Sequence, residues 1–67
     1  MLVSIIIPCY NSEHTIGKVV ELAIQEFEKL ENYECEFVLV NDYSRDGTWN
    51  SIRSLTDRYP NVKGINL

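Results

Sequence analysis

The feature that most constrains the fold is a run of apolar, mostly β-branched residues from Leu2 to Ile7, followed directly by Pro8. Apolar side chains stand on both faces of this run, which is typical of a strand covered on two sides, as in parallel sheets. Residues 36–41 repeat the pattern, and residues 62–67 form a third, weaker candidate strand. Because proline has no N–H to donate to a sheet, we expect the first strand to end before Pro8.

Two helices are expected between these strands. An apolar stripe with helical spacing extends from Ile16 to Leu30, and a shorter stripe extends from Trp49 to Tyr59. Trp49 belongs to the second stripe, so packing in the core or at an interface outweighs a ligand role for its ring. Pro60 cannot continue a helix, so it marks the end of the second one.

Polar residues at the helix starts are candidate caps, because their side chains can accept a hydrogen bond from an unpaired backbone N–H. These candidates are Asn11 or Ser12 for the first helix and Asp46 or Thr48 for the second. Glu13 is expected in the first turn of the first helix and Lys29 in its last turn, where both charges suit the helix dipole.

The element order is strand-helix-strand-helix-strand, and helical crossovers of this kind join parallel strands with a right-handed connection. We therefore predict an α/β fold with strand order 3-2-1 and both helices on one face, half of a doubly wound, Rossmann-like sheet. The other face has no helix to cover it, and the first strand has a free edge. We expect residues 1–67 to be the N-terminal part of a larger protein. A non-enzymatic half-domain that self-associates through the bare face or the free edge is the alternative.

Composition excludes several classes of function. The chain has 67 residues and a formal net charge of −4, so it forms one small domain and lacks the basic surface that binding a nucleic acid polymer requires. Cys9 and Cys35 fit no metal-binding spacing and are expected to be free thiols in a reducing compartment. The apolar start is too short for a signal peptide or a membrane span, which predicts a cytoplasmic chain.

Ligands of open α/β sheets bind beyond the carboxyl ends of the strands, where residues 8–12 and 42–47 are expected to form adjacent loops. Asp42 follows the second strand and can accept a hydrogen bond from a ring N–H or a ribose hydroxyl, although it can equally close a turn. Tyr10 can offer a ring face to a planar base, or it can pack at the rim against the first helix.

Other residues of these loops carry simpler interpretations. Asn11 can touch a ligand, but helix capping is its simpler role. Arg45 is expected to be a solvated loop charge, although it could meet a phosphate. His14 has no catalytic partner at a recognisable spacing and is expected to face solvent. Neither loop is glycine-rich, and the dinucleotide and P-loop patterns are both absent.

The two loops resemble those of family 2 glycosyltransferases, which have a doubly wound catalytic domain of the GT-A kind. The family pattern of a strand followed by P-x-Y-N matches residues 3–11, and a strand followed by D/N-D-x-S-x-D-G-T matches residues 38–48. Ser12 replaces a glutamate that is common in the family, and Tyr43 replaces a common glycine.

The resemblance implies transfer of a sugar from a nucleotide-diphosphate donor, with a UDP-sugar favoured, to an acceptor. The residues that it assigns to the nucleotide site are Pro8, Tyr10, Asn11, Val40 and Asp42. It also implies a divalent metal, Mg²⁺ or Mn²⁺, whose D-x-D ligands and the catalytic base would lie after Leu67. We therefore expect no catalytic or metal-binding residue within the chain and no activity from the chain alone.

Residues 61–67 resemble more specifically the branch that loads sugars onto polyisoprenyl phosphates, which would place the longer protein at the cytoplasmic face of a membrane. A third interpretation is a receiver-like or phosphatase-like domain with Asp42 as phosphoacceptor. Such a domain needs further acidic residues at the end of the first strand, where this chain has Pro8 and Cys9.

Overall fold

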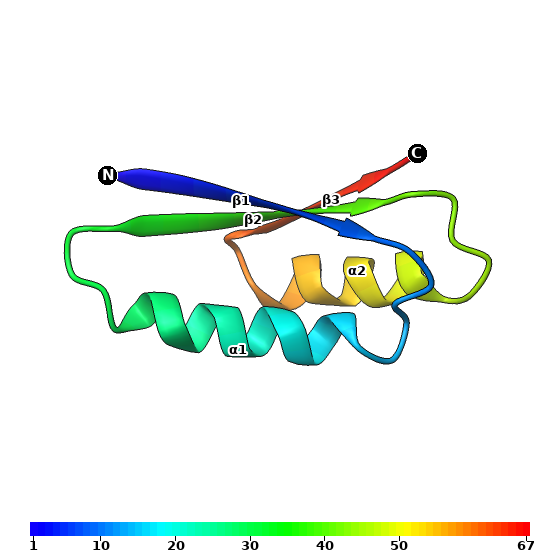
Figure 1. Cartoon of the computed structure of the whole chain (residues 1–67), viewed down its shortest axis with the longest axis horizontal. Coiled ribbons are helices and arrows are strands. Elements are labelled where there is room, and N and C mark those ends of the chain that lie inside the picture. The colour runs from blue at the N-terminus through cyan, green and yellow to red at the C-terminus, as the bar shows by residue number, and fades with distance from the viewer.

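The computed structural model describes all residues, Met1–Leu67, and has three strands and two helices in alternation. The elements are β1 (Leu2–Cys9), α1 (Ile16–Glu28), β2 (Glu34–Asn41), α2 (Thr48–Arg58) and β3 (Val62–Asn66). The strands form one parallel sheet in the order β1-β2-β3, and both helices pack on the same face of it (Figure 1). The predicted α/β architecture, with strand order 3-2-1 and one covered face, is confirmed.

The register brings the carboxyl ends of the strands to one edge of the sheet. Cys9 at the end of β1 lies beside Asn41 at the end of β2, which in turn lies beside Asn66 at the end of β3. The Asn41 side-chain amide donates to Asn66 Oδ1 at 2.7 Å, which ties the two strand ends together. The loops that follow β1 and β2 therefore start from neighbouring points.

The prediction that the first strand ends before Pro8 is wrong. Pro8 lies inside β1 and is the register partner of Val40. The physical reason is the position of β1, which pairs only with β2 and is an edge strand. An edge strand tolerates proline because the missing N–H can be the one that would have faced solvent.

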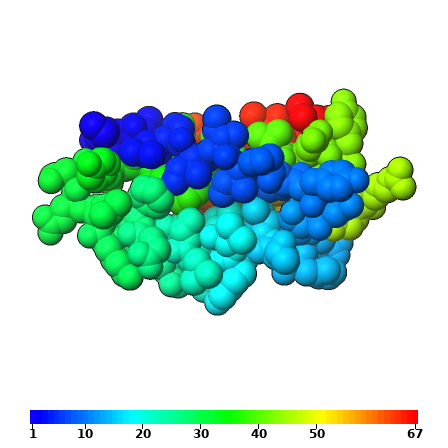
Figure 2. Space-filling view, in the orientation of Figure 1, coloured from blue at the N-terminus to red at the C-terminus, as the bar shows by residue number.

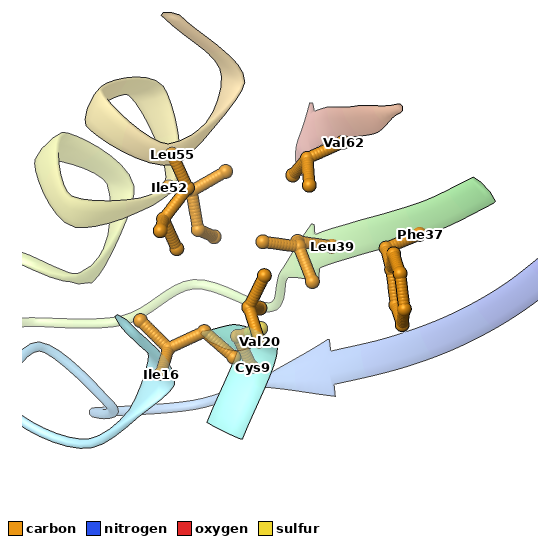
Figure 3. Close-up of a cluster of buried hydrophobic side chains, with 8 residues drawn as sticks. All are labelled: Cys9, Ile16, Val20, Phe37, Leu39, Ile52, Leu55 and Val62. Carbon is orange, nitrogen blue, oxygen red and sulfur yellow. The ribbon is translucent and has the colours of Figure 1, made fainter. Parts of the chain in front are cut away.

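The core lies between the sheet and the two helices (Figure 3). Its eight buried apolar side chains come from all five elements and are Cys9, Ile16, Val20, Phe37, Leu39, Ile52, Leu55 and Val62. Phe37 and Leu39 of β2 are both 0% exposed and form its centre. The ring of Phe27 meets Phe37 edge-on, with centroids 6.1 Å apart. Trp49 packs against the same core, as its spacing predicted.

The helix ends differ from the predicted caps. Thr15 is the N-cap of α1 and Gly47 is the N-cap of α2, and neither makes a side-chain capping bond. Glu13 precedes α1, and Lys29 lies at its C-cap instead of within its last turn. Asn11 and Ser12 do not cap α1, because the Asn11 side chain accepts the N–H of Arg45 and the Ser12 hydroxyl donates to the carbonyl oxygen of Tyr10. Asp46 does accept the N–H of Thr48, the first residue of α2, although Gly47 lies between them. At the other end of α2, Tyr59 is extended, as expected for a residue that precedes proline.

The face of the sheet away from the helices is largely apolar but has a polar row across its middle. Leu2, Ile6 and Ile65 are 61%, 67% and 47% exposed. Glu36 accepts hydrogen bonds from Ser4 Oγ at 2.5 Å and from Lys63 Nζ at 3.1 Å. The hydrogen bond from Ser4 and the charge of Lys63 lower the pKa of the Glu36 carboxyl below its usual range.

Neither thiol forms a disulfide in the structure. Cys9 is buried at the end of β1, and Cys35 is half-buried in β2. Burial raises the pKa of both thiols, and the charge of Glu36 adds to the effect at Cys35. Neither helix has the length and apolar character that crossing a membrane demands.

Candidate functional site

The candidate site is formed by two loops at the carboxyl edge of the sheet. Residues 10–15 connect β1 to α1, and residues 42–47 connect β2 to α2. Figure 2 shows these segments, blue and yellow-green, at the same end of the molecule. The backbone N–H of Asp42 donates to the carbonyl oxygen of Cys9 at 3.0 Å, which continues the pairing of β1 with β2 into the loops. The predicted adjacency of the two loops is confirmed.

Asn11 joins the first loop to the second. Its backbone N–H donates to Ser44 Oγ at 3.0 Å, and its Oδ1 accepts the N–H of Arg45 at 3.0 Å. The backbone of Asn11 is left-handed, with φ 47°, a conformation that asparagine adopts more readily than most residues. The side chain that was expected to cap α1 therefore links the loops.

A second set of bonds joins the loops nearer the helix starts. Glu13 Oε1 accepts the N–H of Gly47 at 2.5 Å, and the N–H of Glu13 donates to Asp46 Oδ2 at 3.2 Å. The N–H of Ser12 donates to Thr48 Oγ1 at 2.8 Å. A Cβ at position 47 would collide with the Glu13 carboxylate, so a larger residue there would displace the Glu13 side chain from this bond. We call these bonds, together with those of Asn11, the loop brace.

The carboxylate of Asp46 is the charged centre of the loop brace. Its Oδ1 accepts the N–H of Thr48 at 3.0 Å and also the Thr48 hydroxyl. These bonds, led by the one from the Thr48 hydroxyl, lower the pKa of the Asp46 carboxyl below its usual range. They stabilise the ionised form, so the brace is strongest when Asp46 is charged.

This pKa shift predicts a specific loss of stability in acid. The folded chain binds the Asp46 proton less readily than the unfolded chain, so stability rises with pH in this window. The stability that the Asp46 carboxylate contributes is complete above the ordinary aspartate pKa of about 3.9. It is lost as the pH falls through the lower pKa that Asp46 has in the folded chain. Denaturant unfolding between pH 2 and 6 should show less acid destabilisation for Asp46→Asn than for the wild type. Asp57→Asn, at an exposed carboxylate of α2, is the control and should leave the profile unchanged.

The structure brings three of the five predicted nucleotide-site residues together at the rim. Tyr10, Asn11 and Asp42 follow the ends of β1 and β2, and both Tyr10 and Asp42 are exposed. Pro8 and Val40 lie within β1 and β2, where they are register partners, two residues before Tyr10 and Asp42 respectively. The Asp42 side chain is exposed and makes no hydrogen bond with another residue, so its carboxylate is accessible to a ligand.

Several residues of the site were missed or given a different role by sequence reasoning. Glu13 was assigned to the helix dipole, yet its carboxylate binds an N–H in a loop 34 positions away. Ser44 was given no role, yet it accepts a bond from Asn11. Tyr43 has a left-handed backbone with φ 54°. The motif that this loop resembles commonly has glycine at this position, and that difference was the available signal for the left-handed conformation. His14 is exposed, as predicted, with Nε2 3.3 Å from Glu13 Oε2.

The cavity of the chain lies at the opposite end of the sheet from these loops. It has a volume of about 360 Å³ and is lined mainly by apolar side chains near the amino ends of β2 and β3, among them Phe27, Tyr33, Cys35 and Tyr59. None of the predicted site residues contributes to it. The candidate site is therefore the exposed rim formed by the two loops at the carboxyl edge of the sheet, and it lies outside this cavity.

Comparisons with known proteins identify a family and several relatives for this chain. Residues 4–67 match the family described as Glycosyl transferase family 2. The chain is 37% identical over 62 residues to a prophage bactoprenol glucosyl transferase homolog of Escherichia coli and to a bactoprenol glucosyl transferase of Shigella phage SfX, covering 92% of this chain and 20% of each relative. It is 37% identical over 68 residues to a dolichyl-phosphate beta-glucosyltransferase of Trichomonas vaginalis, covering 96% of this chain and 21% of that protein. The chain thus spans about a fifth of the length of these relatives. No solved structure matches it.

Proposed function

The chain belongs to glycosyltransferase family 2, and from that membership we propose that residues 1–67 form the nucleotide-binding part of a larger catalytic domain. That domain transfers a sugar from a nucleotide-diphosphate donor to an acceptor. The relatives support this assignment because their names describe glucosyl transferases. This chain contributes the part of the donor site that holds the nucleotide base.

One observation carries the proposal: the backbone bond from Asp42 to Cys9, together with the loop brace, holds Tyr10 and Asp42 on the same rim, at the carboxyl edge of a parallel sheet. The exposed Asp42 carboxylate accepts a ring N–H of the base, and uracil offers such an N–H, so a UDP-sugar is the favoured donor. Tyr10 presents its ring face to the same base. Pro8 and Val40, paired behind the rim, line the base site, and Asn11 fixes the loop that carries Tyr10.

The acceptor that we propose for the whole protein is a polyprenyl phosphate. Two of the relatives are named for bactoprenol and one for dolichyl phosphate. An acceptor of this kind resides in a membrane, so we place the whole protein at the cytoplasmic face of one. No residue of this chain is assigned to the acceptor site.

The residues present do not fit the divalent metal that the family resemblance implies. No three His, Cys, Asp or Glu side chains lie together in an arrangement that could hold a metal ion. We therefore assign no metal ligand to the residues of this chain. The ligands and the catalytic base belong to the remainder of the domain, and we expect the chain alone to transfer no sugar.

Calorimetric titration of the chain with UDP tests the proposal. A base held by one charge-assisted hydrogen bond and one stacking contact should bind with a Kd of about 1 mM. Ribose 5-phosphate has no base and is the control ligand. Binding of UDP together with much weaker binding of ribose 5-phosphate supports the base site. Equal affinity for the two ligands, or no heat from UDP, contradicts it.

Self-association is a second candidate property, and the bare face of the sheet favours it. The exposed Leu2, Ile6 and Ile65 lie on that face, and β1 offers an unpaired edge. Exposed apolar surface of this kind and free strand edges favour pairing with another chain. Sedimentation at low micromolar concentration should show dimers or larger species, and Ile6→Lys should shift them toward monomer. A folded wild-type monomer at these concentrations would contradict this candidate.

A further inference from the structure

Tyr10 and Tyr43 lie near the starts of the two adjacent loops, one and two residues after the last paired residues of β1 and β2, Cys9 and Asn41. Tyr10 follows Cys9 and precedes Asn11, and Tyr43 follows Asp42 and precedes Ser44. On one side of the two tyrosines, the Asp42 N–H donates to the Cys9 carbonyl at 3.0 Å. On the other side, the Asn11 N–H donates to Ser44 Oγ, also at 3.0 Å. The two loop segments that carry the tyrosines are therefore held side by side by hydrogen bonds.

Both tyrosine side chains extend into solvent. Tyr10 is 61% exposed and Tyr43 is 74% exposed. The ring pair that packs together in this chain is Phe27 with Phe37, in the core. The faces of Tyr10 and Tyr43 are thus uncovered, and Asp42 lies beside Tyr43 at the same rim. Two exposed tyrosine rings and an exposed carboxylate on the same rim form a suitable arrangement for a planar, hydrogen-bonding ligand.

The backbone of Tyr43 is held in an unfavourable conformation. The non-glycine residues with left-handed backbones are Asn11, Asn32 and Tyr43. Asparagine tolerates this conformation, whereas a bulky residue in it is an outlier. Such outliers persist where the surrounding structure fixes them, and they cluster at ligand sites. Here the bonds of Asp42 and Ser44 fix the backbone on both sides of Tyr43.

We propose that Tyr43 is a second base-binding residue, which stacks on the nucleobase from the side opposite Tyr10 while Asp42 bonds to the edge of the base. The inference rests on the proposed nucleotide site and adds to it a further residue of the same rim. The ligand class is a nucleoside diphosphate with a planar base. In this arrangement the base contacts an aromatic ring on each of its two faces, and we call it the two-sided clamp.

Tyr43→Gly separates a stacking role from a structural one, because the two roles predict different results. Glycine adopts a φ of 54° without steric penalty, so the variant should melt at the same temperature as the wild type or higher. Loss of one stacked ring should weaken UDP binding about tenfold in calorimetry. Tyr43→Asn also lacks the ring and tolerates the left-handed backbone, so it should show the same loss. Tyr43→Phe keeps the ring and should bind UDP within about twofold of the wild type.

The same titrations distinguish failure of this inference from failure of the proposed function. If Asp42→Asn weakens UDP binding and Tyr43→Gly and Tyr43→Asn bind like the wild type, the stacking role of Tyr43 is wrong and the nucleotide site stands. If the wild type does not bind UDP, both are wrong. Loss of affinity in both ring-deleted variants, with full affinity in Tyr43→Phe, supports the two-sided clamp.

Discussion

Replacing Phe37 with alanine is expected to remove most of the stability of the chain. Phe37 is fully buried at the centre of β2 and meets the ring of Phe27 edge-on. Truncating a buried phenylalanine destabilises a protein by about 3–5 kcal/mol, because apolar surface is lost and a cavity remains. A domain of this size has a total stability of only about 3–10 kcal/mol. Urea unfolding followed by circular dichroism should show a variant that is largely unfolded or has a much lower midpoint.

Val19→Ala is the matched control for this prediction. Val19 lies in α1 and is 48% exposed, and alanine is the better helix former. Its effect on the free energy of unfolding should stay within about 0.5 kcal/mol. A Phe37→Ala variant as stable as Val19→Ala would mean that the packing between the sheet and the helices does not hold this fold together.

Replacing Asp42 with alanine is expected to weaken UDP binding by about 1–3 kcal/mol, or about 5- to 150-fold. The reason is that the ring N–H of the base loses its charged acceptor. The Asp42 side chain is exposed and its N–H bonds through the backbone to Cys9, so the substitution should leave the fold intact. Calorimetric titration measures the affinity, and the melting temperature reports on the fold.

Asp57→Ala is the control for the Asp42 prediction, because it removes the same charge from the exposed surface of α2. It should bind UDP like the wild type. Equal affinity for UDP in the Asp42→Ala variant, the Asp57→Ala variant and the wild type would reject the contact of Asp42 with the base.

The order of the elements and the parallel pairing of the strands could be predicted because they depend on patterns spread over many residues. The two-sided apolar run at residues 2–7 indicated a parallel sheet, and the stripe from Ile16 to Leu30 indicated a helix above it. The adjacency of the two loops followed, because parallel neighbouring strands end at the same edge of a sheet. The end of β1 was mispredicted because the tolerance of a proline depends on which strand lies at the edge.

The details of the rim could not be predicted, because they depend on contacts between residues far apart in the chain. Asn11 and Ser12 were expected to bond locally to α1, but tertiary contacts gave Asn11 a partner 34 positions away. The bond between Glu13 and Gly47 likewise has no local sequence signal. The left-handed backbone of Tyr43 could be suspected only from its place in a motif that commonly has glycine.

The most direct test of the account is to map UDP binding on the amide spectrum of the ¹⁵N-labelled chain. The account predicts chemical-shift changes on titration that concentrate at residues 9–12 and 41–45, with little change around the cavity near Tyr33 and Tyr59. Ribose 5-phosphate at the same concentration should leave the shifts of Asp42 and Tyr43 nearly unchanged. UDP-induced changes confined to residues outside the two loops, or no changes at millimolar UDP, would contradict the assignment of this rim as the base site.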